Sequence, residues 1–382
     1  MLPQEDGELN DLVVDLIAKA KTLAGGLNPS LTNSISDLVR SMNCYYSNLI
    51  EGHNTHPRDI DRALNNDFVD DTEKRDLQLE AKAHIEVQSI IDQGDFWQIA
   101  NPVSVDFVKR VHHEFYQLLP ENLLWVENFD RTKRVKVIAG EFRDGDVVVG
   151  RHLAPHAVNL DKFMARFEQA YSLNRMSKVQ RVVAVAASHH RLLWIHPFYD
   201  GNGRVARLFS HALLKQLDIG SGLWSVSRGL ARRHSDYKFL LEAADLPRQG
   251  DLDGRGSLSQ RALKDFCKFF LEVCIDQVDY MSSILEPKEL LRRIELYVQD
   301  EMAAGRLPKR SFALLREAFY QGEFARGEAA EITGYKVAQA RVVLSQLVAK
   351  GFLKSDTSKG PVRLAFPIDA VERWFPQLYP IA

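Results

Sequence analysis

Cysteine is scarce in this 382-residue sequence, which contains only Cys44, Cys267 and Cys274. An odd number of cysteines without C-x-x-C spacing argues against a disulfide framework and against a cysteine zinc site. We therefore expect three buried thiols that act as small hydrophobic groups, in a protein from a reducing compartment.

An excess of one charge and a long apolar run are also missing. Lys and Arg number 49 against 51 acidic residues, so no global field draws the chain to nucleic acid or to an anionic membrane. No apolar run approaches the roughly 20 residues of a membrane span, and the N-terminal MLPQEDGELN has acids where a secretory signal has Lys or Arg. These absences predict a cytoplasmic protein without membrane contact.

Helical periodicity dominates what is present. Hydrophobic residues make up 45% and charged residues 26%, an ordinary globular composition with room for two or three domains. Apolar residues recur at helical spacing along most of the chain, and residues 176–195 are apolar on most faces, as in a central buried helix. We predict a mainly α fold with an N-terminal helical region over 1–100, a core over 101–300 and a C-terminal domain over 301–382.

One segment in the first half has the pattern of strands. In VKVIAGEFRDGDVVVGRHL, two β-branched runs flank Asp144-Gly145, a dipeptide favoured in tight hairpin turns. The segment predicts a β-hairpin that turns at this dipeptide.

The last part of the chain has a different pattern. Helices are predicted over Ser311–Tyr320, Arg326–Thr333 and Val337–Lys350, followed by a two-stranded wing in FLKSD and VRLAF. This is the order of a winged helix-turn-helix. Residues 309–366 carry ten basic and five acidic residues, a local excess that could support DNA contact, although such modules also bind proteins. The polar candidates for base contact are Lys336, Gln339, Arg341 and Gln346.

The most informative stretch is HPFYDGNGRVAR, from His196 to Arg207. Gly201 and Gly203 remove the Cβ atoms that would block a ligand, so backbone N–H groups can converge on a phosphate at the start of a helix. Asn202 adds a neutral donor. Arg204 and Arg207 share a helix face and can grip more than one phosphate.

Two further residues of the stretch suggest chemistry. A carboxylate at Asp200, beside a phosphate site, fits a Mg²⁺ ligand, because Mg²⁺ uses one or two carboxylates together with substrate phosphates. His196 has the pKa range of a general base for a hydroxyl nucleophile. Together these groups predict transfer of a phosphorus-containing group to a hydroxyl.

Other interpretations of this stretch are weaker. GNGRVA fits the dinucleotide fingerprint, but that motif needs a preceding strand, and here a long helix precedes it. No Walker A sequence or kinase motif set occurs. A plain glycine loop with solvated arginines is the structural alternative.

Histidines elsewhere in the chain give no metal site. The pairs His112-His113 and His189-His190 do not complete a zinc motif, and His152 and His156 have no assigned role.

The stretch resembles the signature of the Fic family, H-P-F-x-[DE]-G-N-G-R-x-x-R, at every fixed position. The resemblance implies a helical Fic fold that moves AMP from ATP to a Ser, Thr or Tyr hydroxyl of a target protein. It assigns His196 as the base, Asp200 to Mg²⁺, Asn202 with the backbone of Gly201 and Gly203 to the α- and β-phosphates, and Arg204 and Arg207 to the outer phosphates. Relatives with Lys at the second glycine act as kinases, so Gly203 favours adenylylation, although other nucleotides stay possible.

The resemblance also implies a flap and a nucleoside contact. Fic proteins carry a β-hairpin flap whose edge pairs with an extended segment of the target. The matching place is Gly140–Gly150, with the docking residues Gly140, Glu141, Phe142, Arg143, Val147, Val148 and Val149. Tyr237 resembles a family position near the nucleoside, although an aromatic residue at helical spacing is more often part of the core.

A third resemblance lies near the N-terminus. Ser47-x-x-x-Glu51-Gly52 resembles the inhibitory [ST]-x-x-x-E-[GN] helix of Fic proteins, although the pattern alone usually marks a solvated helix face. A Glu51 carboxylate on Arg207 would take the guanidinium that should hold the γ-phosphate. The resemblance thus implies a self-inhibited adenylyltransferase that modifies other proteins and itself. A homodimer is a further expectation. Two alternatives stay open: removal of AMP, and a winged-helix DNA-binding regulator that only senses the nucleotide.

Overall fold

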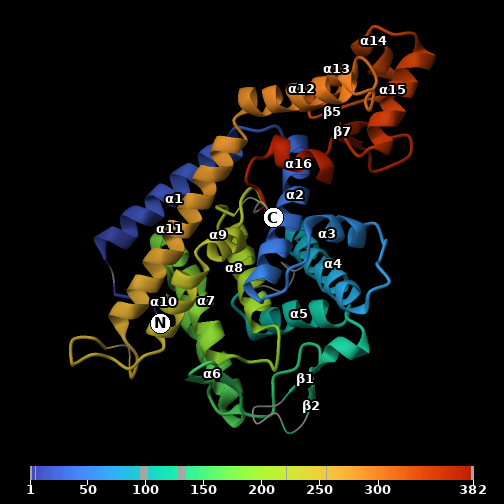
Figure 1. The fold of residues 1–382 in the computed structure, drawn as a ribbon. Helices are drawn as coiled ribbons and strands as arrows, with labels where there is room; N and C mark the ends of the chain where they lie inside the picture. Colours follow the sequence, from blue (N-terminus) through green and yellow to red (C-terminus); the bar gives the residue numbers. More distant parts are fainter. Residues whose placement is uncertain are drawn as a thin grey trace. The chain divides into compact units, whose positions relative to one another are not determined.

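The computed structural model describes residues 2–4, 6–94, 102–127, 132, 134–220, 222–254 and 256–379. Its described part is mainly helical, as predicted (Figure 1). The chain forms two compact units: unit 1 comprises Met1–Ala20 and Asn43–Gln277, and unit 2 comprises Lys21–Met42 and Val278–Ala382. These units cut the chain at places other than residues 100 and 300, and the three-part division stays a prediction.

Helices build unit 1, and three of them, α1, α2 and α11, also contribute residues to unit 2. The helices are α1 (Gly7–Gly25), α2 (Pro29–Ile50), α3 (Pro57–Leu64), α4 (Thr72–Gln93), α5 (Val105–Tyr116), α6 (Leu160–Tyr171), α7 (Lys178–Ile195), α8 (Asn202–Gln216), α9 (Val226–Arg232), α10 (His234–Ala244) and α11 (Gln260–Ile284). Short 3₁₀ turns lie at Glu121–Leu124, Ala157–Asn159 and Leu173–Arg175.

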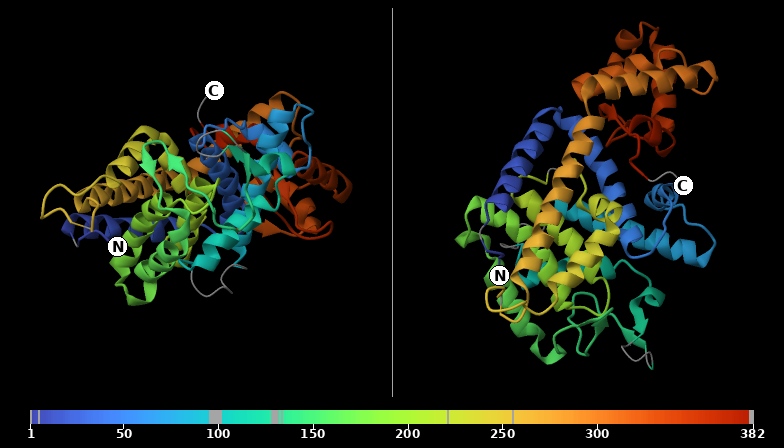
Figure 2. Two further views of the ribbon diagram at one scale, coloured as in Figure 1. Left: turned by 90° about the horizontal axis from the view of Figure 1, so that it is seen from below. Right: turned by 60° about the vertical axis from the view of Figure 1, so that its left-hand side comes forward.

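Helices α7 and α8 pack against each other within unit 1 (Figures 1 and 2). Residues 182–190 of α7 are all buried, which confirms the prediction of a buried helix there. The first N–H groups of a helix need hydrogen-bond partners, and Ser177 and Gln180 form a capping box that supplies them for α7. Phe209 of α8 lies among Phe107 of α5 and Phe167 of α6, with ring centroids 6.4 and 5.7 Å away. This aromatic packing fixes α8 against α5 and α6.

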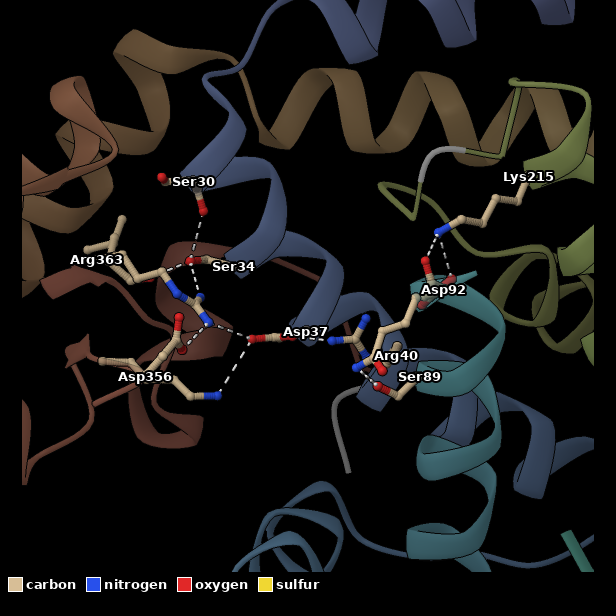
Figure 3. A network of polar contacts seen from close by, with 12 residues as sticks. Ser30, Ser34, Asp37, Arg40, Ser89, Asp92, Lys215, Asp356 and Arg363 are labelled. Carbon is tan, nitrogen blue, oxygen red and sulfur yellow. Dashed lines mark hydrogen bonds and ion pairs between the residues drawn. The ribbon is translucent and has the colours of Figure 1, made fainter. Parts of the chain in front are cut away.

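The end of α4 is tied to α8 by charge. The Asp92 carboxylate accepts from His211 Nε2 at 2.8 Å, and the Asp92 carbonyl accepts from Lys215 Nζ at 2.6 Å (Figure 3). Helix α4 therefore lies along α8, where its side chains can reach the first turn of that helix.

The strands of unit 1 differ from the predicted hairpin. β1 (Trp125–Glu127) pairs antiparallel with β2 (Arg134–Lys136), and β3 (Val148–Val149) pairs with β4 (His152–Leu153). The prediction of pairing across Asp144-Gly145 is wrong, since the turn between β3 and β4 is at Gly150, which has φ +60°. Gly145 does not take the positive φ that a tight hairpin turn needs, because side chains of other residues hold this dipeptide in an irregular loop.

Unit 2 contains the C-terminal elements, drawn in orange and red in Figures 1 and 2. They are α12 (Pro287–Ala303), α13 (Ser311–Gln321), β5 (Glu323–Phe324), a 3₁₀ turn (Arg326–Glu328), α14 (Ala329–Thr333), α15 (Val337–Ala349), β6 (Leu353–Lys354), β7 (Val362–Leu364) and α16 (Ile368–Trp374). The three predicted helices and both predicted strands are present. The additional strand β5 pairs with β7, so the small sheet has the order β5-β7-β6.

An ion network inside unit 2 uses one of the basic residues counted above. Arg363 on β7 lies 3.5 Å from Asp37 of α2 and 3.6 Å from Asp356, and it donates to Ser34 (Figure 3). Ser34 in turn donates to the Leu364 carbonyl at 2.6 Å. Two carboxylates thus neutralise Arg363, and the positive charge open to a partner is smaller than the sequence count.

Two sequence predictions concern burial and membranes. Cys44, Cys267 and Cys274 are fully buried, as predicted. Within the described ranges, no helix combines the length and the apolar content that crossing a membrane requires.

The capping box gives a local stability prediction. Ser177→Ala removes the acceptor for the Gln180 N–H, so the first turn of α7 should lose about 1 kcal/mol of protection. Hydrogen exchange should show its amides exchanging roughly fivefold faster. Ser345→Ala, at an exposed position inside α15, is the control that should leave α7 unchanged. Equal exchange in both variants would contradict the role of the cap.

Candidate active site

The loop between α7 and α8 has two left-handed residues at its ends. His196 caps α7 with φ +49°, and Gly201 caps α8 with φ +77°. Gly201 adopts this conformation freely, whereas a histidine there is strained, and such strain is typical of functional sites. The chain thereby ends one buried helix at Ile195 and starts the next at Asn202, with six residues between them and His196 as the first of the six.

Asn202 closes this loop from inside. Its Oδ1 accepts from the Phe198 N–H at 3.0 Å, and its Nδ2 donates to the Phe198 carbonyl at 2.8 Å. The side chain is buried and holds the loop together, so its predicted role as a phosphate donor is not supported. The backbone N–H groups of the first turn are left to face an anion, because they have no partner within the helix.

Aromatic rings support the loop from α5. The ring of Phe198 is fully buried and stacks on His112 with centroids 3.8 Å apart, and His112 stacks on Tyr116 at 4.3 Å. Burial lowers the pKa of His112 to about 3, so the ring is neutral, and its Nδ1 accepts from the Gly140 N–H at 2.9 Å. The Phe198 ring thus anchors the loop in the core, through His112 and Tyr116, which were not predicted as part of the site.

Asp200 is fixed and ionised. Tyr116 donates its hydroxyl to Asp200 Oδ2 at 2.7 Å. Burial raises the pKa of Asp200, but the nearby Arg204 charge and the Tyr116 hydrogen bond outweigh it and leave that pKa below the usual value. A carboxylate that stays charged in a largely buried place, beside a site for anions, fits the donor set of a Mg²⁺ ion shared with phosphates.

His196 is a neutral base in this environment. Burial lowers the pKa of its imidazole to about 4, and the charges of Arg143 and His152 act in the same direction. At neutral pH the ring therefore has a free lone pair, as a general base requires.

Arg207, on the second turn of α8, is bound by the end of α2. Its Nε donates to Ser47 Oγ at 2.9 Å, and its Nη2 donates to Glu51 Oε1 at 2.5 Å. Arg207 is buried, whereas the Glu51 side chain is 33% exposed. The pair lowers the pKa of Glu51 against the opposing effect of burial. The structure thus brings together the three residues of the suspected inhibitory contact.

The Glu51 carboxylate also marks a place for an anion. An added Cβ at Gly203 would lie 2.3 Å from Glu51 Oε1 and 3.1 Å from an Arg207 nitrogen. The carboxylate therefore occupies the space that the missing Cβ leaves at the first turn of α8. A negative group that Arg207 binds beside the N-terminus of α8 stands where a phosphate oxygen would be favourable.

Arg204 has a different partner, which the sequence did not indicate. Its Nη2 donates to Glu80 Oε2 of α4 at 2.9 Å, and the His53 ring nitrogen lies 2.8 Å from the same oxygen. Glu80 raises the pKa of His53, so the imidazolium is favoured beside it. Arg204 and Glu80 are both buried, at 4% and 8% exposure. Arg204 is thus neutralised by a buried carboxylate, whereas the partner of Arg207, Glu51, is partly exposed to solvent.

Tyr237 lies in the core. It is 3% exposed, and its hydroxyl pairs with His189 Nε2 at 2.7 Å. His189 Nδ1 contacts Ser210 Oγ of α8 at 2.8 Å. This placement agrees with the core alternative, and the predicted contact of Tyr237 with a nucleoside is not supported.

The predicted flap residues divide into two groups. Phe142 and Arg143 are turned toward the α7–α8 loop, since Phe142 packs 5.5 Å from Phe198 and the buried Arg143 donates to the His196 carbonyl, whereas Gly140 lies against α5 and donates to His112. The buried Arg143 side chain therefore supports the loop, and the assignment of these three residues to target docking stays a prediction. Glu141 is exposed, and Val147, Val148 and Val149 run into the β3–β4 hairpin, where Val149 is 41% exposed. This hairpin, rather than one at Asp144-Gly145, is the segment that could serve as a flap.

Four other histidines that the sequence analysis named have protein partners. His113 contacts the Ala139 carbonyl, His152 the Trp194 carbonyl, His156 the Asp146 carboxylate and His190 the Asp245 carboxylate. In the part of the chain that the structure describes, no three His, Cys, Asp or Glu residues are grouped as a metal site.

The fold and the loop together define the class of protein. Residues 102–214 match the family model described as Fic/DOC family, so this segment forms a Fic domain. The fold is also that of a Fic family protein from Desulfovibrio desulfuricans G20, at a TM-score of 0.55 and 18% identity, over 96% of this chain and 98% of that one. A Fic domain containing signaling protein from Bacteroides thetaiotaomicron VPI-5482 aligns at a TM-score of 0.52 and 19% identity, over 71% of this chain and 96% of that one.

Among curated proteins, a protein adenylyltransferase Fic of Drosophila willistoni is 30% identical over 186 residues, which is 48% of this chain and 33% of the relative. The protein of the same name from Drosophila melanogaster is 30% identical over 166 residues. The chain thus spans about a third of the length of the curated relatives that it matches.

The conformation of Gly201 leads to a stability prediction. A Cβ at Gly201 would meet the Tyr116 ring at 2.7 Å, in addition to the strain of φ +77°. Gly250 has φ +85° but open space around it, so Gly250→Ala measures the strain alone, about 1 kcal/mol. We expect Gly201→Ala to melt lower than Gly250→Ala by at least about 2 °C. Equal melting temperatures would show that Tyr116 does not restrict the loop.

Proposed function

We propose that this chain is a protein adenylyltransferase, an enzyme that moves AMP from ATP to a hydroxyl side chain of a target protein. One observation carries the proposal: the Glu51 carboxylate lies over Gly203 and against Arg207, so the α7–α8 loop already holds an anion at the start of α8. The name of the curated relatives supports the choice of AMP as the transferred group.

The residues of the loop have distinct roles in this reaction. His196, neutral at physiological pH, accepts the proton of the attacking hydroxyl. The first turn of α8 and Arg207 bind the phosphates and stabilise the charge that develops on them. Asp200 would hold Mg²⁺, which supplies positive charge to the phosphate oxygens when bound. The β3–β4 hairpin would present the target, whose acceptor we assign to Ser, Thr or Tyr.

Glu51 is the proposed brake. Arg207 can bind Glu51 or an outer phosphate, and the carboxylate also fills the space over Gly203, so the two anions compete for both charge and volume. The Glu51 side chain, 33% exposed, is the exchangeable partner, whereas the Glu80 side chain, 11% exposed, stays on Arg204. Arg204 then orders the first turn of α8 rather than reaching out to a phosphate.

The remaining proposals concern partners. The order of helices and strands in unit 2 supports a winged-helix module, and α15 contains no acidic residue, with Lys336 and Arg341 exposed near its start. DNA binding by this module, homodimer formation and self-modification stay predictions. AMP removal is the alternative direction of the same site, because Glu51 could orient a water there.

A labelling experiment tests the proposed activity and the brake. Wild type and Glu51→Gly are incubated with Mg²⁺ and with ATP labelled at either the α- or the γ-phosphate. We expect label from the α-phosphate alone, at least about tenfold more with Glu51→Gly, because Arg207 is released for the nucleotide. Label on protein is followed by autoradiography and by intact mass.

Matched histidine variants give the control. Glu51→Gly/His196→Ala should lose the label, while Glu51→Gly/His113→Ala, which changes an exposed histidine of α5, should keep it. Label from the γ-phosphate would make the protein a kinase. Binding of ATP without any product would favour the nucleotide sensor, and loss of AMP from a modified target would favour the removal reaction.

The pH profile gives an independent prediction for His196. Because the pKa of His196 is about 4, the imidazole becomes protonated only at pH values well below the ordinary histidine pKa near 6.5. Activity should therefore decline only in that acidic range. The kcat/KM of Glu51→Gly should thus be constant from about pH 8 to pH 6 and fall below that range. A decline centred near pH 6.5 or above would show that the working base is not in this buried environment.

A further inference from the structure

Arg143 is a buried cation that the proposed reaction leaves without a role. It lies between β2 and β3, and its side chain is 2% exposed. Its Nε donates to the carbonyl of His196 at 2.8 Å, its Nη1 to the Gly145 carbonyl at 2.8 Å and its Nη2 to the Pro155 carbonyl at 2.5 Å. A longer contact of 3.5 Å joins Nη2 to the Ile195 carbonyl. One guanidinium thus connects the residues before and after the β3–β4 hairpin with the end of α7.

The carbonyls that Arg143 binds at α7 belong to the helix C-terminus. The last carbonyls of a helix have no partner within the helix, and the macrodipole makes this end negative. A guanidinium that donates to His196 and Ile195 satisfies these groups and complements the dipole. Arg143 therefore acts as a side-chain cap of α7 at the residue proposed as the base.

The surroundings of Arg143 are otherwise nearly uncharged. Asp146 lies 3.9 Å from Nη1, and this carboxylate is half exposed and also bonded to His156. Burial lowers the pKa of Arg143, the direction expected for a cation without a close buried acid. Neutral carbonyls in fixed positions must then compensate the buried charge, so moving any of them is costly. This cost is a restraint on the positions of the loop and of the hairpin.

Two more contacts join the same segments. The Arg143 N–H donates to the Pro197 carbonyl at 2.9 Å, and Tyr199 donates its hydroxyl to Asp144 Oδ1 at 2.6 Å. These contacts lie immediately after His196 in the chain, whose φ of +49° is unfavourable for a histidine. A strained conformation persists only where surrounding contacts over-determine it, and here they come from residues 143 and 144.

We propose that Arg143 is a positioning residue of the transfer reaction: its guanidinium fixes the strained backbone of His196 and locks the β3–β4 hairpin to the catalytic loop. The Arg143 side chain then fixes the position of His196, the proposed base, relative to the β3–β4 hairpin, which would present the target. This inference rests on the proposed function for its effect on transfer, but its effect on His196 is independent of it. Arg143 touches neither the reacting atoms nor a phosphate in this arrangement.

Charge gives a second readout of the same arrangement. Burial is the main cause of the low pKa of His196, and a hydrogen bond with the Leu193 backbone opposes it; of the charged or titratable groups, Arg143 and His152 of β4 disfavour the imidazolium and Asp200 favours it. Removing the Arg143 charge therefore raises the pKa of His196. Comparing a variant that keeps the charge with one that removes it therefore separates the effect of the charge on His196 from the effect of the guanidinium's contacts.

The test compares Arg143→Lys, which keeps the charge but has a single nitrogen, with Arg143→Gln, both in the Glu51→Gly background. Arg143→Lys cannot span carbonyls on both sides, so kcat should fall roughly 10- to 100-fold while the KM for ATP changes less than about threefold. Arg143→Gln should lose at least as much kcat and should also shift the acid limb of the pH profile upward. Arg293→Lys is the matched control, because Arg293 donates to backbone carbonyls of Ile284 and Trp374 in unit 2.

A measurement without turnover separates this inference from the proposed function. The imidazole of His196 is titrated by NMR in ¹³C-histidine-labelled protein, with its signal assigned from His196→Ala. We expect the pKa of His196 to rise by roughly half a pH unit or more in Arg143→Gln and to stay near the wild-type value in Arg143→Lys. If Arg143→Gln leaves this pKa unchanged, the inference is wrong whether or not the protein transfers AMP. Unchanged kcat in both variants of an active enzyme would equally overturn it.

Discussion

The N-terminus of α8 has to accommodate two buried guanidinium groups at the positive end of a helix. Arg204 and Arg207 are 4% and 3% exposed, and an uncompensated charge in such a place costs several kcal/mol. The carboxylates that compensate them come from the N-terminal helices, Glu80 from α4 and Glu51 from the end of α2. The position of these helices against α8 is therefore a consequence of charge as much as of packing, and it brings the N-terminal part of the chain to the site.

The two ion pairs differ in a way that matters for function. Glu80 is buried, and it accepts from Arg204 and His53 together, so its removal from the pair would strand a charge. Glu51 is one-third exposed and can move into water at little cost. Arg204 consequently stabilises the fold, and Arg207 is available to whichever anion binds it better. This asymmetry arises from burial alone, since the two arginines belong to one motif and one helix face.

How much the sequence could predict follows from where each signal lies. The α7–α8 loop was predictable because its residues are contiguous, and the Ser47–Glu51 contact because both residues lie one helical turn apart. Glu80, His53, His112 and Tyr116 carry no local signal, because each is a single residue whose partner is far away in the chain. The hairpin turn was misplaced since Asp144 and Gly145 are engaged by Tyr199 and Arg143, which turn propensity does not include. Asn202 and Tyr237 were assigned to a ligand because their own partners, Phe198 and His189, are visible only in the fold.

The absence of a Cβ atom at Gly203 matters for both the proposed reaction and its proposed inhibition. A Cβ at residue 203 would collide with the Glu51 carboxylate and would narrow the space at the first turn of α8. The glycine that makes room for a phosphate therefore also makes room for the inhibitory carboxylate, and neither property can be removed by adding bulk there without affecting the other. A nucleotide phosphate that enters this space must displace Glu51 from it. Under the proposed function, relief of inhibition and correct placement of the phosphates would then be one event, in which the stronger anion takes both Arg207 and the volume over Gly203.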